Sequence, residues 1–155
     1  AIISTPIFHE GHVFVSSAYG VGCNGFKVTH SGGRFTAKEV YANKTISNHH
    51  GGCIRVGDHV YASSGGTLAC MELKTGKKLW EQRLGKAKSW SSMCYVEGRL
   101  YIVNMDGVSF VLEPNPTSCK IVSENSLDGL TRGSMAFSQG LIFVRTYKQL
   151  ICIGN

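Results

Sequence analysis

The chain of 155 residues is 43% hydrophobic and carries a formal net charge of +6, with 19 glycines and only 3 prolines. It contains no apolar run near the roughly 20 residues that a membrane-spanning helix needs, so we expect no membrane span. Its lysines and arginines are dispersed and accompany no recognised nucleic-acid-binding motif, so we expect no nucleic-acid partner.

Four glycines mark four copies of one unit. Gly11, Gly57, Gly98 and Gly140 each precede a short apolar segment, and their spacings are 46, 41 and 42 residues. Apolar and polar residues alternate with a period of two, and no helical stripe is present. A repeat of about 40–45 residues with several short strands is typical of a propeller blade. We therefore predict an all-β chain, a β-propeller of about four blades with four antiparallel strands each.

The expected strands follow the same order in every unit. First strands are expected ahead of the glycines, at 4–8, 51–55, 91–95 and 133–137, and second strands directly after the glycines. Third strands are expected at 66–71, 107–112 and 148–153, and fourth strands at 35–41, 78–83 and 119–124. This pattern divides a single propeller segment, 1–155, into approximate blades 1–46, 47–87, 88–129 and 130–155.

The last unit ends directly after its third strand, so we expect its blade to be incomplete. A propeller closes when one terminus supplies the outer strand of the blade that the other terminus begins, which removes the exposed edges. We therefore expect half of an eight-bladed propeller, whose partner is the rest of the propeller or a second copy of the chain. A closed four-bladed ring is the less favoured alternative.

The cysteines and histidines do not predict a metal site. The six cysteines lack the Cys-x-x-Cys spacing of structural zinc sites. We expect them to be small buried hydrophobic residues, although an exported protein would leave disulfides open. His49 and His50 are adjacent, and neighbouring side chains on a strand point to opposite faces, so both reach one ion only in a loop.

One unit carries a recognisable family pattern. The segment from Gly66 to Trp80 runs through a strand and then Thr75 and Gly76 before the tryptophan. It resembles the repeat of the pyrroloquinoline-quinone-like propellers, in which the Thr-Gly turn and the Trp dock one blade on the next. The other three units keep this pattern weakly. The chain is similar to the C-terminal half of exported bacterial propellers of the quinoprotein-like or outer-membrane-assembly-like kind, which implies a periplasmic or extracellular location.

The resemblance does not bring enzyme activity with it. Quinoprotein dehydrogenases need a Ca²⁺ site of carboxylate and amide oxygens, an Asp base and, in many, a disulfide between neighbouring cysteines. This sequence has no adjacent cysteine pair and only three aspartates. We therefore expect no cofactor and no catalytic residue, and a binding scaffold that holds a protein, a saccharide or a small anionic ligand on one face of the channel. The alternative is a fragment of a quinone-dependent dehydrogenase whose catalytic residues lie in other blades.

A binding site is predicted where the first strands begin. Counting eight residues back from each glycine gives an arc about the propeller axis, made of Ile3, His49, Trp90 and Arg132. Such an arc offers donors, a flat aromatic surface and cations, which suit an anionic or sugar-like ligand. The competing interpretation is a surface loop in which the histidines cap backbone groups and the tryptophan fills the channel. The predicted ligand-binding residues are Asn48, His49, His50, Trp90 and Arg132.

Overall fold

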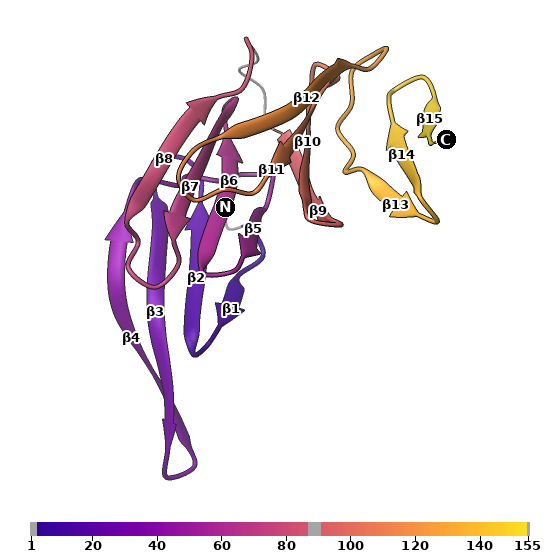
Figure 1. Ribbon diagram of the computed structural model, residues 1–155. Helices are drawn as coiled ribbons and strands as arrows, with labels where there is room; N and C mark the ends of the chain where they lie inside the picture. Colours follow the sequence, from indigo (N-terminus) through magenta and orange to yellow (C-terminus); the bar gives the residue numbers. More distant parts are fainter. Residues whose placement is uncertain (1–2, 87–90, 155) are drawn as a thin grey trace.

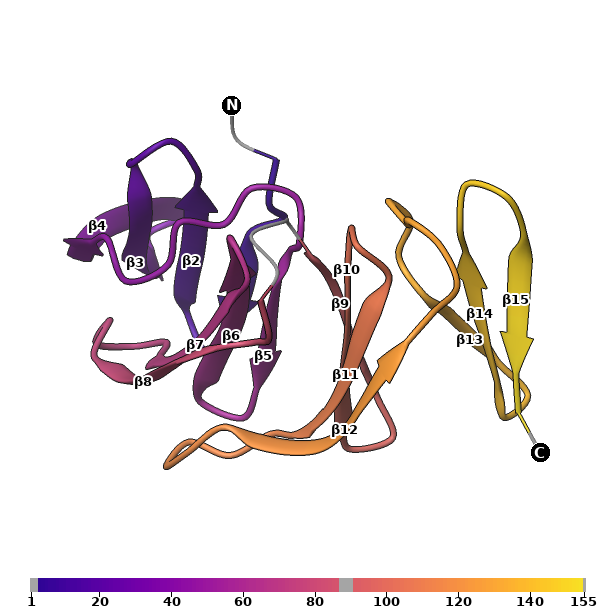
Figure 2. The ribbon, with the colours of Figure 1, turned by 90° about the horizontal axis from the view of Figure 1, so that it is seen from above.

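The computed structural model describes residues 3–86 and 91–154, and the side chain of Ser91 is also outside the described part. Within these ranges the strands form four antiparallel sheets that follow one another along the chain (Figure 1). The described residues contain no helix that is long and apolar enough to cross a membrane. Seen from above, the sheets stand side by side around an open arc (Figure 2).

Each sheet is a meander in which consecutive strands are neighbours. The first sheet contains β1 (Ile7–His9), β2 (His12–Ser17), β3 (Gly22–Ser31) and β4 (Arg34–Asn43). The second contains β5 (Cys53–Val56), β6 (His59–Ser64), β7 (Thr67–Glu72) and β8 (Lys78–Arg83). The third contains β9 (Ser91–Val96), β10 (Arg99–Asn104), β11 (Val108–Glu113) and β12 (Lys120–Ser126). The fourth contains β13 (Ala136–Ser138), β14 (Leu141–Arg145) and β15 (Leu150–Ile153).

These sheets confirm the all-β prediction and the incomplete last blade. Three sheets have four strands, and the fourth, in the residues that the structure describes, has three. The first strands lie nearest to one another, since β5 contacts both β1 and β9. The innermost strands of the arc are therefore the ones whose entrances were expected to form a site.

Two-residue turns join the first two strands of each sheet, but the turns are of two types. Glu10–Gly11, Glu97–Gly98 and Gln139–Gly140 have positive φ at both residues, as a type I′ turn requires. In the second sheet the turn is Gly57–Asp58, and only the glycine has positive φ, which is the pattern of type II′. Asp58, rather than Gly57, therefore occupies the second turn position, which Gly11, Gly98 and Gly140 hold in the other sheets. Their assumed equivalence is wrong by one residue in the second unit.

Neighbouring sheets bury apolar layers between them, and strand alternation lets one strand serve two layers. In β6, Val60 faces the layer shared with the first sheet, whereas Tyr61 faces the layer shared with the third sheet. In β7, Met71 faces the layer shared with the first sheet, and Cys70 faces the layer shared with the third sheet. All four side chains are at most 2% exposed, and each such burial contributes about 1.5–3 kcal/mol for a large apolar residue.

Cysteines take part in these layers. Cys23 and Cys70 are buried in the layers on either side of the second sheet, and Cys53 packs beside the first of them. Burial raises the pKa of the Cys53 thiol to about 12 and that of Cys70 to about 11. These thiols are therefore protonated at neutral pH and act as small hydrophobic groups.

Aromatic side chains on the outer strands attach each of the first two sheets to the next. The Tyr41 hydroxyl on β4 donates to the Leu73 carbonyl, 2.7 Å away, before the Thr-Gly turn of the second sheet. Trp80 on β8 repeats this contact, donating from Nε1 to the Asn115 carbonyl at 2.8 Å. A Cβ atom at Gly76 would lie 2.5 Å from the Tyr41 ring, so glycine is required where the turn packs on the aromatic ring.

The β3–β4 hairpin is longer than the outer hairpins of the second and third sheets. Both of its strands have ten residues, and the distal half extends away from the rest of the sheet (Figure 1). Every residue from Thr29 to Thr36 is exposed, including Phe35 at 76%, which packs only on the ring of His30 among the described aromatic contacts. The distal half therefore adds no buried layer to the fold.

Shortening this hairpin tests that conclusion. Thr29 and Thr36 are directly opposite each other, two residues before the Ser31–Arg34 pair that closes the present turn, so an Asn-Gly turn can replace residues 30–35 without changing the register. We expect the free energy of unfolding, measured by urea denaturation, to change by no more than about 0.5 kcal/mol because only exposed residues are removed. A loss above about 2 kcal/mol would show that the distal half supports the fold.

Removing the rim hydrogen bond of Tyr41 tests the aromatic attachment. Tyr41→Phe keeps the ring but removes the donor to Leu73, and we expect it to lower the free energy of unfolding by about 1 kcal/mol. Tyr95→Phe is the matched control. Tyr95 is 43% exposed, so loss of its hydroxyl should leave the free energy of unfolding almost unchanged. Equal effects of the two changes would contradict the role given to Tyr41.

Candidate functional site

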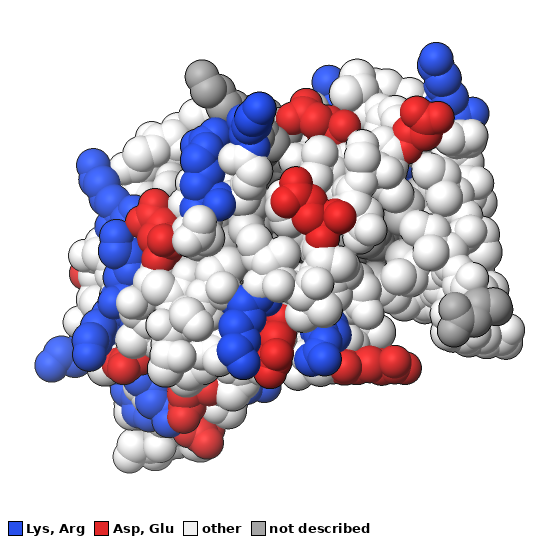
Figure 3. Space-filling model, turned by 45° about the horizontal axis from the view of Figure 1, so that its top comes forward, with Lys and Arg blue, Asp and Glu red and all other residues white. Residues whose placement is uncertain are grey.

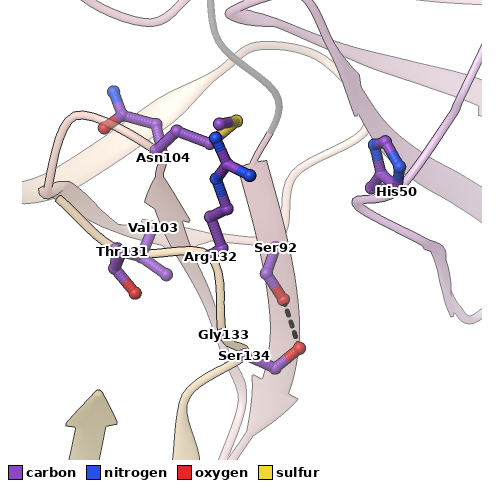
Figure 4. A pocket seen from close by; sticks show the side chains of 9 residues that line it. His50, Ser92, Val103, Asn104, Thr131, Arg132, Gly133 and Ser134 are labelled. Carbon is purple, nitrogen blue, oxygen red and sulfur yellow. Dashed lines mark hydrogen bonds between the residues drawn. The ribbon is translucent and has the colours of Figure 1, made fainter. Parts of the chain in front are cut away.

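A cavity of about 360 Å³ lies where the last three sheets approach one another. One wall comes from the segment before β13, the opposite wall from the segment before β5, and the floor from the end of β10 (Figure 4). It is thus formed at the entrances of first strands, where the sequence predicted binding. The lining residues are His50, Ser92, Val103, Asn104, Met105, Thr131, Arg132, Gly133 and Ser134.

Buried polar groups hold the floor of the cavity in place. The Asn104 Oδ1 atom accepts from the backbone N–H groups of Asp106 and Val108, at 3.0 and 2.9 Å, and so fixes the β10–β11 turn. Thr131 donates its hydroxyl to the Arg145 carbonyl at 2.6 Å, and its N–H donates to the carbonyl of the cavity residue Met105. These hydrogen bonds position the floor of the cavity without a ligand.

The rim carries one permanent cation. The Arg132 guanidinium lies 5.7 Å from the centre of the Tyr147 ring, and none of the ion pairs formed between described residues includes it. Beside it, the Ser92 and Ser134 hydroxyls share a hydrogen bond of 2.6 Å across the boundary between the third and fourth sheets (Figure 4). Since none of the described lining residues is acidic, their net charge is positive.

The two adjacent histidines lie in a loop and contact each other. Their Nδ1 atoms are 2.5 Å apart, and the ring of Tyr19 meets that of His49 edge-on at 4.9 Å. Burial holds the pKa of His49 below its ordinary value, and the neighbouring charge of His50 adds to this effect. His49 is therefore uncharged at pH 7 and packs against His50. The exposed His50 lines the cavity.

Asn48 acts within the fold. Its side-chain oxygen accepts from the Ser4 hydroxyl at 2.5 Å and from the Gly52 N–H at 3.1 Å. Its Nδ2 donates to the carbonyls of Ser63 and Gly52, at 2.7 and 3.0 Å, and its backbone N–H donates to the Ser16 hydroxyl. Only 1% of the residue is exposed, so these bonds join the first two sheets away from solvent.

The structure thus brings two of the predicted residues, His50 and Arg132, to one cavity. The one-residue shift of the second turn explains why His50, rather than His49, is the equivalent of Arg132. Trp90 lies outside the described residues. Sequence reasoning did not identify Asn104 or Ser134; the Asn-x-Asp-Gly turn after β10 was the available signal for the first, and adjacency to Arg132 for the second.

A second polar cluster joins the first two sheets at the opposite ends of their inner strands. His9, Glu10 and Asp58 lie close enough to share an ion, but the Lys74 ammonium is already 2.6 Å from Glu10 and 3.4 Å from Asp58. The hydrogen bond from Lys74 lowers the pKa of Glu10, and its charge lowers the pKa of Asp58. The lysine therefore supplies the positive charge that these carboxylates need, and Asp58 has a structural partner.

The fold defines a β-propeller, and the cavity lies at the entrances of its inner strands. The chain belongs to the family described as outer membrane protein assembly factor BamB, whose profile matches residues 1–82 and 64–154. The expected membership of the pyrroloquinoline-quinone-like propellers is confirmed by this match. No curated protein sequence matches the chain.

Solved structures share the fold at low sequence identity. BamB from Moraxella catarrhalis is 18% identical and superposes with a TM-score of 0.70 over 97% of this chain and 43% of its own. The computationally designed Ika4 protein is 12% identical, with a TM-score of 0.68 over 99% of this chain and 91% of its own. The Cps50 (Swd1) β-propeller domain from Myceliophteria thermophila is 11% identical, with a TM-score of 0.64 over 95% of this chain and 53% of its own. This chain therefore spans less than half the length of the Moraxella protein.

Replacing Asn48 separates a structural role from a binding role. Asn48→Ala removes four side-chain hydrogen bonds and leaves buried groups without partners, so we expect the free energy of unfolding to fall by about 2–4 kcal/mol. Asn24→Ala is the control, because Asn24 bonds only at the surface, to Glu39. If Asn48→Ala leaves urea unfolding unchanged, the assignment of Asn48 to the fold is wrong.

Proposed function

We propose that this chain is part of a non-catalytic propeller scaffold that holds a protein segment in the cavity lined by His50 and Arg132. The observation that carries the proposal is the cavity itself, a hollow with a hydrogen-bonded polar floor whose described lining residues include the cation of Arg132 and no acidic residue. Few convergent polar groups on a preformed hollow are typical of binding sites. Its volume accommodates a few residues of an extended chain rather than a folded domain.

The family supports the choice of partner. Its description is that of an outer membrane protein assembly factor, so we infer that the held segment belongs to a protein of that assembly process and that the scaffold is periplasmic. The charges of this chain do not suggest nucleic acid, because acidic side chains lie among the basic ones on the face in Figure 3.

Further blades complete the scaffold in this proposal. Phe8 lies opposite Val13 on the face of the first sheet that points away from the second, and it is 67% exposed. On the last sheet, Leu150 is 68% exposed and Cys152 is also exposed. Apolar sheet faces of this kind require a covering layer. We propose that blades of the same polypeptide, or of a second copy, supply it and complete an eight-bladed ring.

Filling the cavity tests the scaffold. Ser134→Trp places a large ring on the rim without removing a charge, and Ser118→Trp, in the exposed β11–β12 turn, is the matched control. The probe is a fluorescently labelled outer-membrane β-barrel polypeptide, unfolded in urea and diluted into buffer with the chain. We expect fluorescence anisotropy to report binding that Ser134→Trp weakens about tenfold or more and that Ser118→Trp leaves unchanged. Absence of binding at micromolar concentration, or equal binding by both variants, would refute the scaffold proposal.

A further inference from the structure

We infer that the cavity binds a carboxylate group carried next to an apolar side chain, as at the C-terminus of an extended polypeptide. This inference rests on the proposed function for the location of the site and adds the chemistry of its ligand. Three features of the cavity support it: the charge balance, the set of donors and the apolar part of the lining.

The charge balance selects a single negative charge. Among the described lining residues, Arg132 alone has a permanent charge, and it forms no ion pair with the residues that the structure describes. Its guanidinium presents planar, paired donors that match a carboxylate in a bidentate arrangement. A doubly charged phosphate would keep one charge uncompensated there, and an uncharged saccharide would leave the guanidinium unpaired.

Two further polar groups of the cavity can donate to a ligand. Asn104 uses its oxygen for two backbone N–H groups, which leaves the Nδ2 amide as the end that can donate. In the pair of serines, Ser92 donates to Ser134, so the Ser134 hydroxyl hydrogen is available to another acceptor. An acceptor-only ligand suits this set, and an ionised carboxylate has acceptors alone.

The lining next to these donors is apolar. The buried Val103 side chain and the thioether of Met105 belong to the same cavity, so a carboxylate bound by Arg132 has hydrocarbon beside it. An apolar residue at a chain end offers both features within one residue. An aspartate or glutamate within a chain offers the carboxylate but adds a polar backbone on either side of it.

Short peptides distinguish these sources. Three probes are titrated calorimetrically into the 155-residue chain: N-acetyl-Ala-Ala-Leu with a free carboxylate, the same peptide with a C-terminal amide, and N-acetyl-Ala-Glu-Ala-amide. We expect the free-acid peptide to bind at least about tenfold more tightly than its amide, because the amide removes the charge that pairs with Arg132. Stronger binding of the glutamate peptide would assign the site to an acidic side chain, and equal binding of the acid and the amide would overturn the inference.

Two variants of the chain connect the effect to the cavity. Arg132→Gln should abolish the preference for the free acid, whereas Arg99→Gln, at the opposite end of β10 from Asn104, should preserve it. Both residues are exposed, so circular dichroism should record folded protein in each case. A preference that survives in Arg132→Gln, or absence of binding at millimolar peptide, would also overturn the inference. If Ser134→Trp still blocks the unfolded polypeptide in that case, the scaffold proposal stands and the carboxylate inference alone fails.

Discussion

Face-to-face burial between neighbouring sheets is the interaction on which this structure depends. A sheet of three or four short strands has two faces and cannot cover both by itself, so each must lie against another sheet. The alternation of Val60 with Tyr61 on β6 shows that the second sheet buries one face against the first sheet and the other face against the third. A slip of one residue would exchange the two layers, which is why the register is fixed by turns of constant length.

Polar contacts arrange the layers once burial has brought them together. Asn48 connects the inner ends of the first and second sheets, and Tyr41 and Trp80 connect the outer rims of successive blades. The boundary between the third and fourth sheets is different. Here the inner strand β9 and the segment before β13 are joined by the hydrogen bond between Ser92 and Ser134, and no aromatic residue of β12 attaches to the last sheet among the described contacts. The cavity lies beside this boundary and reaches His50 of the second unit.

Much of this architecture could be predicted from the sequence, because it follows from local patterns. Period-two alternation and the repeated glycines place most of the strands, and the Thr75–Gly76 turn with Trp80 indicates the family. The exchange of a type I′ turn for a type II′ turn could not be inferred from a glycine count, since glycine favours both. The cavity was predicted in part: repeat counting led to Arg132 but not to its near neighbour Ser134, and Asn104 joins the cavity only through contacts with a unit distant in sequence.

The different attachment of the last sheet has a mechanical consequence. Where an aromatic residue on the outer strand bonds to the next sheet, the two sheets are connected at their outer strands as well as at their inner strands, and both connections oppose separation of the sheets. At the third boundary no aromatic contact of this kind is found among the described residues, so the outer strand β12 is not tied to the last sheet in this way. Because Ser92 and Ser134 also line the cavity, splaying at this joint would change the width of the cavity.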